Sequence, residues 1–168
     1  MFKVSIFFLQ KKGNKMFSEK EIKEIKEFIK KTDKDTKIYI GTDSTKLKKK
    51  KVRYATVVVI HQSGIKGCKI FGYTSFEKDI DYKANKPFNR MMSETYKSAE
   101  LYLELANTIG NRYNEVHLDI NKEEIHGSSV AINAAIGYIQ GVCGIVPKSK
   151  PAENSFAASC VADKWCKK

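Results

Sequence analysis

Two aspartates stand where carboxylates can act together on a cation. Asp43, in Gly41-Thr42-Asp43-Ser44, and Asp119, in His117-Leu118-Asp119-Ile120, each follow a run of apolar residues that predicts a β-strand. If these strands are parallel neighbours, they lie about 4.8 Å apart and their carboxyl ends meet at one edge of the sheet. Two adjacent carboxylates repel each other, so a cation between them is favourable. Taken singly, Asp43 also fits a turn and Asp119 a loop cap.

A third carboxylate, Glu94, is predicted on the buried side of a helix. The helix over residues 88–109 has an apolar stripe that includes Met91, Leu101 and Leu105, and Glu94 falls on it. A carboxylate on a buried stripe is unfavourable unless a charge or a metal ion pairs with it. A helix phase that differs by one residue would place Glu94 at the surface instead.

The fourth acid, Asp163, lies in the last predicted helix, residues 156–165. It shares a face with Phe156 and Cys160, which turns it toward the rest of the fold, while a surface position beside Lys164 is the alternative. Glu153 is another carboxylate nearby, and we expect it to be exposed in a loop. Oxygen ligands of this kind suit Mg²⁺.

The elements that must position these acids alternate along the chain. We predict strands at residues 37–42, 53–61, 68–76, 114–120 and 144–148, and helices at residues 18–31, 88–109, 128–140 and 156–165. Ser18 and Glu21 form a capping box at the first helix, Ser128 or Ser129 caps the third, and Gly141 ends it.

Right-handed crossovers make the first, fourth and fifth strands parallel, with the second and third as an antiparallel edge. The predicted fold is therefore α/β, a five-stranded mixed sheet of order 3-2-1-4-5 flanked by helices, with an extra N-terminal helix. We expect residues 1–16 to be a leader and residues 17–168 to form one domain.

The charge of the chain favours a polyanionic partner. There are 31 Lys and Arg against 19 Asp and Glu, a net charge of +12, and nucleic acid is the commonest partner of such a chain. The residues expected to contact phosphates are Lys46, Lys48, Lys49, Lys50, Lys51, Arg53 and Lys150. The alternatives are a solvated turn that protects a sheet edge and, for Lys150, a plain exposed side chain. Tyr82 and Phe88 are expected to be available for stacking on bases.

Other features narrow the function classes. No apolar run reaches the roughly 20 residues that span a bilayer, so we expect no membrane partner. The four cysteines form no Cys-x-x-Cys pair and do not cluster with the three histidines, which argues against zinc and favours reduced thiols in the cytoplasm. We expect His117 to be packed in the core and His126 to be an ordinary loop residue.

Several segments resemble one known family, the RNase H-like YkuK family, over residues 17–168. They are Gly41-Thr42-Asp43-Ser44, Met92-Ser93-Glu94-Thr95, His117-Leu118-Asp119-Ile120, Lys150-Pro151, Phe156-Ala157-Ala158-Ser159 and Ala162-Asp163-Lys164. The resemblance implies the ribonuclease H fold, in agreement with the predicted strand order.

The resemblance also implies an activity. In the wider superfamily, acids at matching places hold metal ions, and they correspond to Asp43, Glu94, Asp119 and Asp163, although Asp163 lies further into its helix than is usual. The implied function is hydrolysis of RNA, RNA/DNA hybrid or structured DNA with two Mg²⁺ or Mn²⁺ ions. The alternative is a non-catalytic nucleic-acid-binding protein of the same fold.

Overall fold

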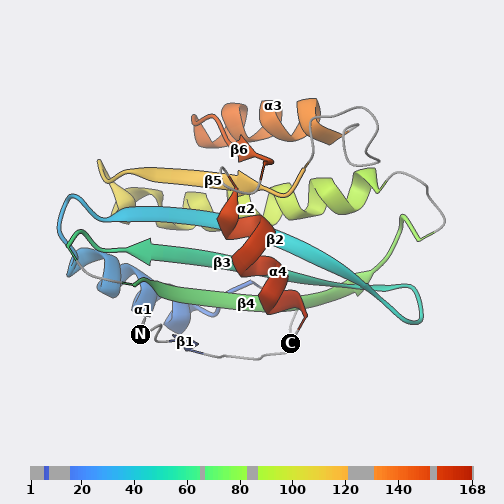
Figure 1. Ribbon diagram of the computed structural model, residues 1–168, viewed down its shortest axis with the longest axis horizontal. Helices are drawn as coiled ribbons and strands as arrows, with labels where there is room; N and C mark the ends of the chain where they lie inside the picture. The colour runs from blue at the N-terminus through green and yellow to red at the C-terminus, as the bar shows by residue number, and fades with distance from the viewer. Residues whose placement is uncertain are drawn as a thin grey trace.

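The computed structural model describes residues 6–7, 16–64, 67–82, 87–120, 131–151 and 155–167. It has a six-stranded sheet with helices on both faces (Figure 1). The strands are β1 (Ile6–Phe7), β2 (Lys37–Leu47), β3 (Lys51–His61), β4 (Lys69–Lys78), β5 (Asn114–Leu118) and β6 (Lys148–Ser149). The helices are α1 (Glu19–Lys30), α2 (Phe88–Ile109), α3 (Ile132–Cys143), the π-helix η3 (Ala157–Ala162) and α4 (Asp163–Cys166).

The sheet has the order β1-β4-β3-β2-β5-β6. β5 pairs in parallel with both β2 and β6. β3 pairs antiparallel with both β2 and β4. This confirms the predicted five-strand order 3-2-1-4-5. β1 adds a sixth strand at the edge, parallel to β4; residues 1–5 and 8–15 of the predicted leader lie outside the described residues.

The first predicted strand was too short. β2 runs to Leu47 rather than ending at residue 42, because its antiparallel pairing with β3 continues as far as Leu47 and Lys51. Its parallel pairing with β5 ends earlier, at Thr42 and Leu118. Asp43 is therefore the first residue of β2 beyond its ladder with β5, and the rest of β2 belongs to a projecting hairpin with β3.

The helices begin and end where local chemistry places them. The predicted capping box is confirmed, because the side chain of Ser18 accepts from the Glu21 amide and the Glu21 carboxylate accepts from the Ser18 amide. α2 matches its predicted bounds, whereas α3 runs past residue 141 and ends at Gly144, whose φ of 70° favours glycine. Ser128 and Ser129 lie outside the described residues. The fifth strand was predicted at residues 144–148, but it is shorter and lies later in the chain, at residues 148–149.

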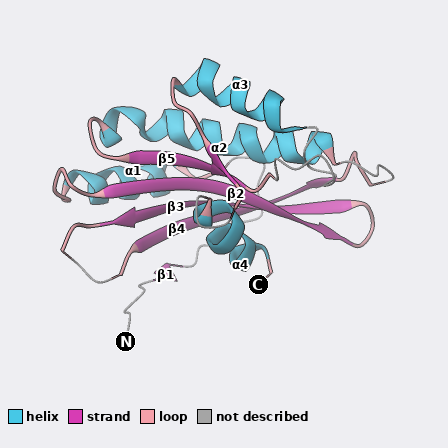
Figure 2. Cartoon of the chain, turned by 45° about the horizontal axis from the view of Figure 1, so that its top comes forward, coloured by secondary structure: helices cyan, strands magenta, loops and turns pink. Residues whose placement is uncertain are grey.

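Two apolar clusters cover opposite faces of the sheet. The larger lies between the sheet and α1, α2 and α3, and the smaller lies under η3 and α4 (Figure 2). Alternation along β2 sends Ile38 and Ile40 into the first cluster and Tyr39 toward the second. Of the helices that the structure describes, none is both long and apolar enough to span a membrane. The four cysteines are not paired in disulfides.

The C-terminal segment approaches β2 closely because Gly41 has no side chain. A Cβ atom on Gly41 would lie 2.5 Å from the backbone nitrogen of Ala158. The segment is also held by His117, whose Nδ1 accepts a hydrogen bond of 3.1 Å from the Ala157 amide. His117 is buried, as predicted, and burial lowers its pKa. Instead of the predicted regular helix, the segment begins with the π-helix η3.

Candidate functional site

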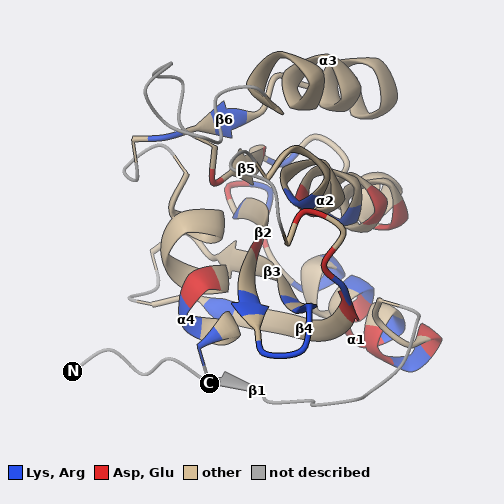
Figure 3. Cartoon of the chain, turned by 90° about the vertical axis from the view of Figure 1, so that its right-hand side faces the viewer, with Lys and Arg blue, Asp and Glu red and all other residues tan. Residues whose placement is uncertain are grey.

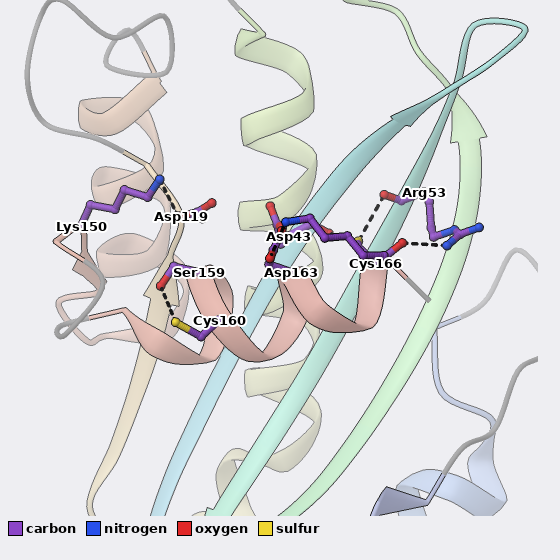
Figure 4. A network of polar contacts seen from close by, with 9 residues as sticks. Asp43, Arg53, Asp119, Lys150, Ser159, Cys160, Asp163 and Cys166 are labelled. Atoms are coloured by element: carbon purple, nitrogen blue, oxygen red, sulfur yellow. Dashed lines mark hydrogen bonds and ion pairs between the residues drawn. The ribbon is translucent and has the colours of Figure 1, made fainter.

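The four predicted acids come together from four different elements. Asp43 lies on β2, Glu94 on α2, Asp119 directly after β5 and Asp163 at the start of α4. Figure 4 shows Asp43 and Asp163 close together, with Asp119 beside them. The charges of Asp119 and Asp163 act on Asp43, and those of Asp43 and Asp119 act on Glu94. The acids therefore form one electrostatically coupled group.

Glu94 reaches this group from the opposite layer of the molecule. Asp43 lies on the η3 and α4 face of β2, because it is two residues from Gly41, and α2 packs on the other face. The charge of Asp43 nevertheless acts on Glu94, and no β5 residue pairs with β2 beyond Thr42.

Asp43 is buried and hard to ionise. Its side chain is among the buried polar groups, at 7% exposure. Burial, followed by the negative charge of Asp119, raises the pKa of Asp43 to about 7, and its hydrogen bond with the Asp163 carboxyl group acts in the same direction. Without a cation, the ionised form of Asp43 is thus disfavoured near neutral pH.

Glu94 is more deeply buried than Asp43, at 3% exposure. Its Oε1 accepts a hydrogen bond of 2.5 Å from the Ser44 hydroxyl, whereas its Oε2 is buried without a hydrogen-bond partner. Burial, with the charge of Asp43 as the next contribution, raises the pKa of Glu94 well above its ordinary value. A buried carboxylate oxygen without a partner is unfavourable, and a cation beside it would relieve that cost.

Two lysines serve as the cations of the site. Lys150 Nζ lies 3.1 Å from Asp119 Oδ1, but not in hydrogen-bonding geometry, so that this buried oxygen has an ionic partner only. Lys167 Nζ lies 2.7 Å from the Asp163 carboxylate. Both lysine side chains are substantially exposed, at 39% and 65%, so these pairs contribute little to stability and exchange readily.

The donor set fits a hard divalent cation. Among the described residues, no three His, Cys, Asp or Glu side chains already stand as a metal-binding group. Asp119 and Asp163 are paired with lysines, and Glu94 accepts a hydrogen bond from Ser44. All the available ligands are carboxylate oxygens, and the Oε2 of Glu94 is buried without a partner, which suits Mg²⁺ or Mn²⁺.

A comparison with known families shows the family to which the chain belongs. A family model described as Ribonuclease H-like matches residues 20–167, most of the chain. The chain belongs to the Ribonuclease H-like family. The predicted resemblance to the RNase H-like YkuK family is confirmed, and membership indicates a function related to nucleic acids. Comparisons with curated proteins and with solved structures give no match.

Most of the predicted phosphate-contacting residues of this ribonuclease H-like protein lie on the hairpin that carries Asp43. The lysines at positions 46 and 48–51 are exposed on the β2–β3 hairpin, which projects past α4 in Figure 1 and is blue in Figure 3. Lys50 Nζ lies 4.3 Å from the centre of the Tyr82 ring. Arg53 is different, because its Nη1 donates a hydrogen bond of 2.7 Å to the carbonyl of Cys166 and so holds the end of α4.

Three residues of the site were not predicted from the sequence. Ser44 holds Glu94, Lys167 pairs with Asp163, and Cys166 donates from its thiol to the Asp43 carbonyl. The four-residue spacing of Lys167 from Asp163 was a usable signal, because side chains so spaced meet on a helix. Ser44 stood in the quoted motif, but its partner 50 residues away could not be read from the sequence. His126 and Glu153 lie outside the described residues.

Proposed function

We propose that this protein is a divalent-metal-dependent nuclease that hydrolyses phosphodiester bonds of RNA, RNA/DNA hybrid or structured DNA. The observation that carries the proposal is the convergence of Asp43, Glu94, Asp119 and Asp163 from four elements of a Ribonuclease H-like fold. Their mutual repulsion and burial raise the pKa of Asp43 and Glu94, which is the electrostatic setting that a cation reverses.

The four acids share one task in this proposal. Asp43, on the central strand, together with Glu94, Asp119 and Asp163, would hold two Mg²⁺ or Mn²⁺ ions. When bound, such ions supply Lewis acidity to a water molecule and to the phosphate. Lys150, once separated from Asp119, is close enough to the acids to pair with a phosphate oxygen.

The lysine hairpin supports the choice of nucleic acid as substrate. The lysines at positions 46 and 48–51 are exposed on the same hairpin that carries Asp43. Each cation that contacts a phosphate releases a counterion, so binding would weaken steeply with salt. The net charge of +12 acts in the same direction over longer distances.

A second candidate function is nucleic-acid binding without catalysis. The observation in its favour is that Lys150 and Lys167 already neutralise Asp119 and Asp163 without a metal ion. In this alternative the acids and lysines form a structural cluster, and the basic hairpin alone contacts the nucleic acid.

Thermal unfolding with and without Mn²⁺ separates the two functions. A ligand at 100 times its Kd stabilises the native state by about 2.7 kcal/mol, or very roughly 5–10 °C for a domain of this size. The nuclease proposal expects this shift in the wild type and its loss in Asp43→Asn. The control is Asp35→Asn, which removes an exposed acid from another loop and should keep the shift.

Cleavage of labelled RNA, hybrid and branched DNA with Mn²⁺ completes the test. Cleavage that Asp43→Asn abolishes and Asp35→Asn retains supports the nuclease. A Mn²⁺-insensitive melting curve together with intact substrates would support the second function and remove the first.

A further inference from the structure

The face of the hairpin that carries Asp43 also carries an aromatic ring. The register pairs Asp43 with Ala55 on β3, and two residues further along the hairpin it pairs Arg53 with Phe76 on β4. Because side chains alternate between faces, Arg53 and Phe76 point to the same side as Asp43. Phe76 lies two strands away from Asp43, at about 4.8 Å per strand, and two residues further along the sheet, at about 3.3 Å per residue. The backbone positions of Phe76 and Asp43 are therefore roughly 12 Å apart.

Phe76 is exposed and held in place by a cation. Its side chain is 39% exposed, although it lies within a long strand. The guanidinium carbon of Arg53 lies 5.4 Å from the centre of the Phe76 ring. Arg53 is in turn fixed by its hydrogen bond to the Cys166 carbonyl. The ring and the cation therefore form a positioned pair at the edge of α4.

Lysines continue the same face toward the hairpin tip. Lys51 on β3 pairs with Lys78 on β4, two residues closer to the hairpin tip than the pair of Arg53 and Phe76. Both lysines are exposed. The turn keeps lysine at positions 49 and 50, where φ is 59° and 56°. Glycine or asparagine suits this left-handed geometry better, and a lysine costs about 1–2 kcal/mol there. The tip therefore carries two cations in a backbone geometry that lysine does not favour.

We propose that Phe76 and Arg53 form a stacking site for an unpaired base of single-stranded nucleic acid, with phosphates along Lys51 and Lys78. An exposed ring beside cations binds the face of a base, and this face is accessible in a single strand but covered in a duplex. The strand would run from the acids toward the hairpin tip. The inference rests on the proposed function, because it gives the substrate a single-stranded segment beside the phosphate to be cleaved.

Fluorescence anisotropy in EDTA tests this site independently of catalysis. The probes are labelled single-stranded DNA and RNA of about 12 nucleotides and a duplex of the same sequence. Phe76→Ala should weaken binding of a single strand by about tenfold or more, since stacking of one base contributes about 1–3 kcal/mol. Binding of the duplex should change by less than about twofold, and Phe76→Trp should retain single-strand binding.

Tyr113→Ala is the matched control. Tyr113 is also an exposed aromatic residue beside a lysine, with Lys37 Nζ 5.7 Å from its ring centre, but it lies at the other end of β2 and next to Glu115. Its replacement should leave both affinities unchanged. Equal losses in Phe76→Ala and Tyr113→Ala, or an equal loss for duplex and single strand, would overturn the stacking site.

The metal site is read out separately in the same variants. Phe76→Ala should keep the thermal shift with Mn²⁺ that Asp43→Asn loses. A failed stacking site therefore leaves the nuclease proposal intact. A missing Mn²⁺ shift in the wild type removes the nuclease, while the anisotropy measured in EDTA still decides whether Phe76 binds a base.

Discussion

Replacement of Asp43 by Asn should stabilise the metal-free protein at alkaline pH. A pKa of about 7, against the ordinary 3.8, makes the ionised Asp43 about 4 kcal/mol less favourable in the folded than in the unfolded chain. The folded state binds the proton more tightly, so this penalty is absent below about pH 4 and complete above about pH 7. Asparagine has a similar shape and carries no charge.

The measurement is urea unfolding in EDTA from pH 5 to pH 8. About 2–3 kcal/mol of the penalty develops over this range, so the stability of Asp43→Asn relative to the wild type should rise by that amount. Asp35→Asn, which removes the same charge from an exposed loop, should show no such trend. Saturating Mn²⁺ should reverse the order at pH 8, because only the wild type keeps the full set of ligands.

The refuting result is a constant difference between Asp43→Asn and the wild type across the pH range. It would mean that the carboxyl group ionises in the folded protein as easily as in water. Asp43 would then lie outside the coupled acidic group, and the argument for a cation at this position would fail with it.

Three further substitutions test the geometry around the acids. Gly41→Ala should destabilise the protein by about 1–3 kcal/mol and speed amide exchange in η3, because the added methyl group meets the backbone of Ala158. Ser44→Ala should cost about 1–3 kcal/mol in urea unfolding at pH 8, because it removes the hydrogen bond that Glu94 accepts. Burial lowers the pKa of His117, so protonation below about pH 6.5 favours the unfolded state. His117→Phe should lower the stability at pH 7, because the Ala157 amide loses its acceptor. It should also reduce the loss of stability between pH 7 and pH 5, because the group that titrates is removed.

Each of these three predictions has an outcome that would contradict it. Gly41→Ala with unchanged exchange in η3 would show that the C-terminal segment does not contact β2. Ser63→Ala, in an exposed turn, is the control for Ser44→Ala, and equal effects of the two would deny the bond to Glu94. A wild-type pH profile that His117→Phe does not change would mean that His117 has the same pKa in the folded and the unfolded chain.

The sequence by itself determined most of the helices, the core strands and the buried position of Glu94. The period of the apolar residues in α2 placed Glu94 on the buried stripe, and the alternation of apolar strands with helices gave the order of the five core strands. These are local rules, since the spacing of side chains on a helix or strand depends only on backbone geometry and chirality. Capping of α1 by Ser18 was predictable for the same reason.

Only the tertiary structure decided which groups meet. Local periodicity predicts the face on which a side chain lies, but its partner across space depends on the path of the whole chain. The bond from Ser44 to Glu94, the approach of Ala158 to Gly41 and the hold of Arg53 on α4 each join residues distant in sequence. The extension of β2 to Leu47 followed from its pairing with β3 rather than from its own residues, because a strand continues while its partner supplies hydrogen bonds.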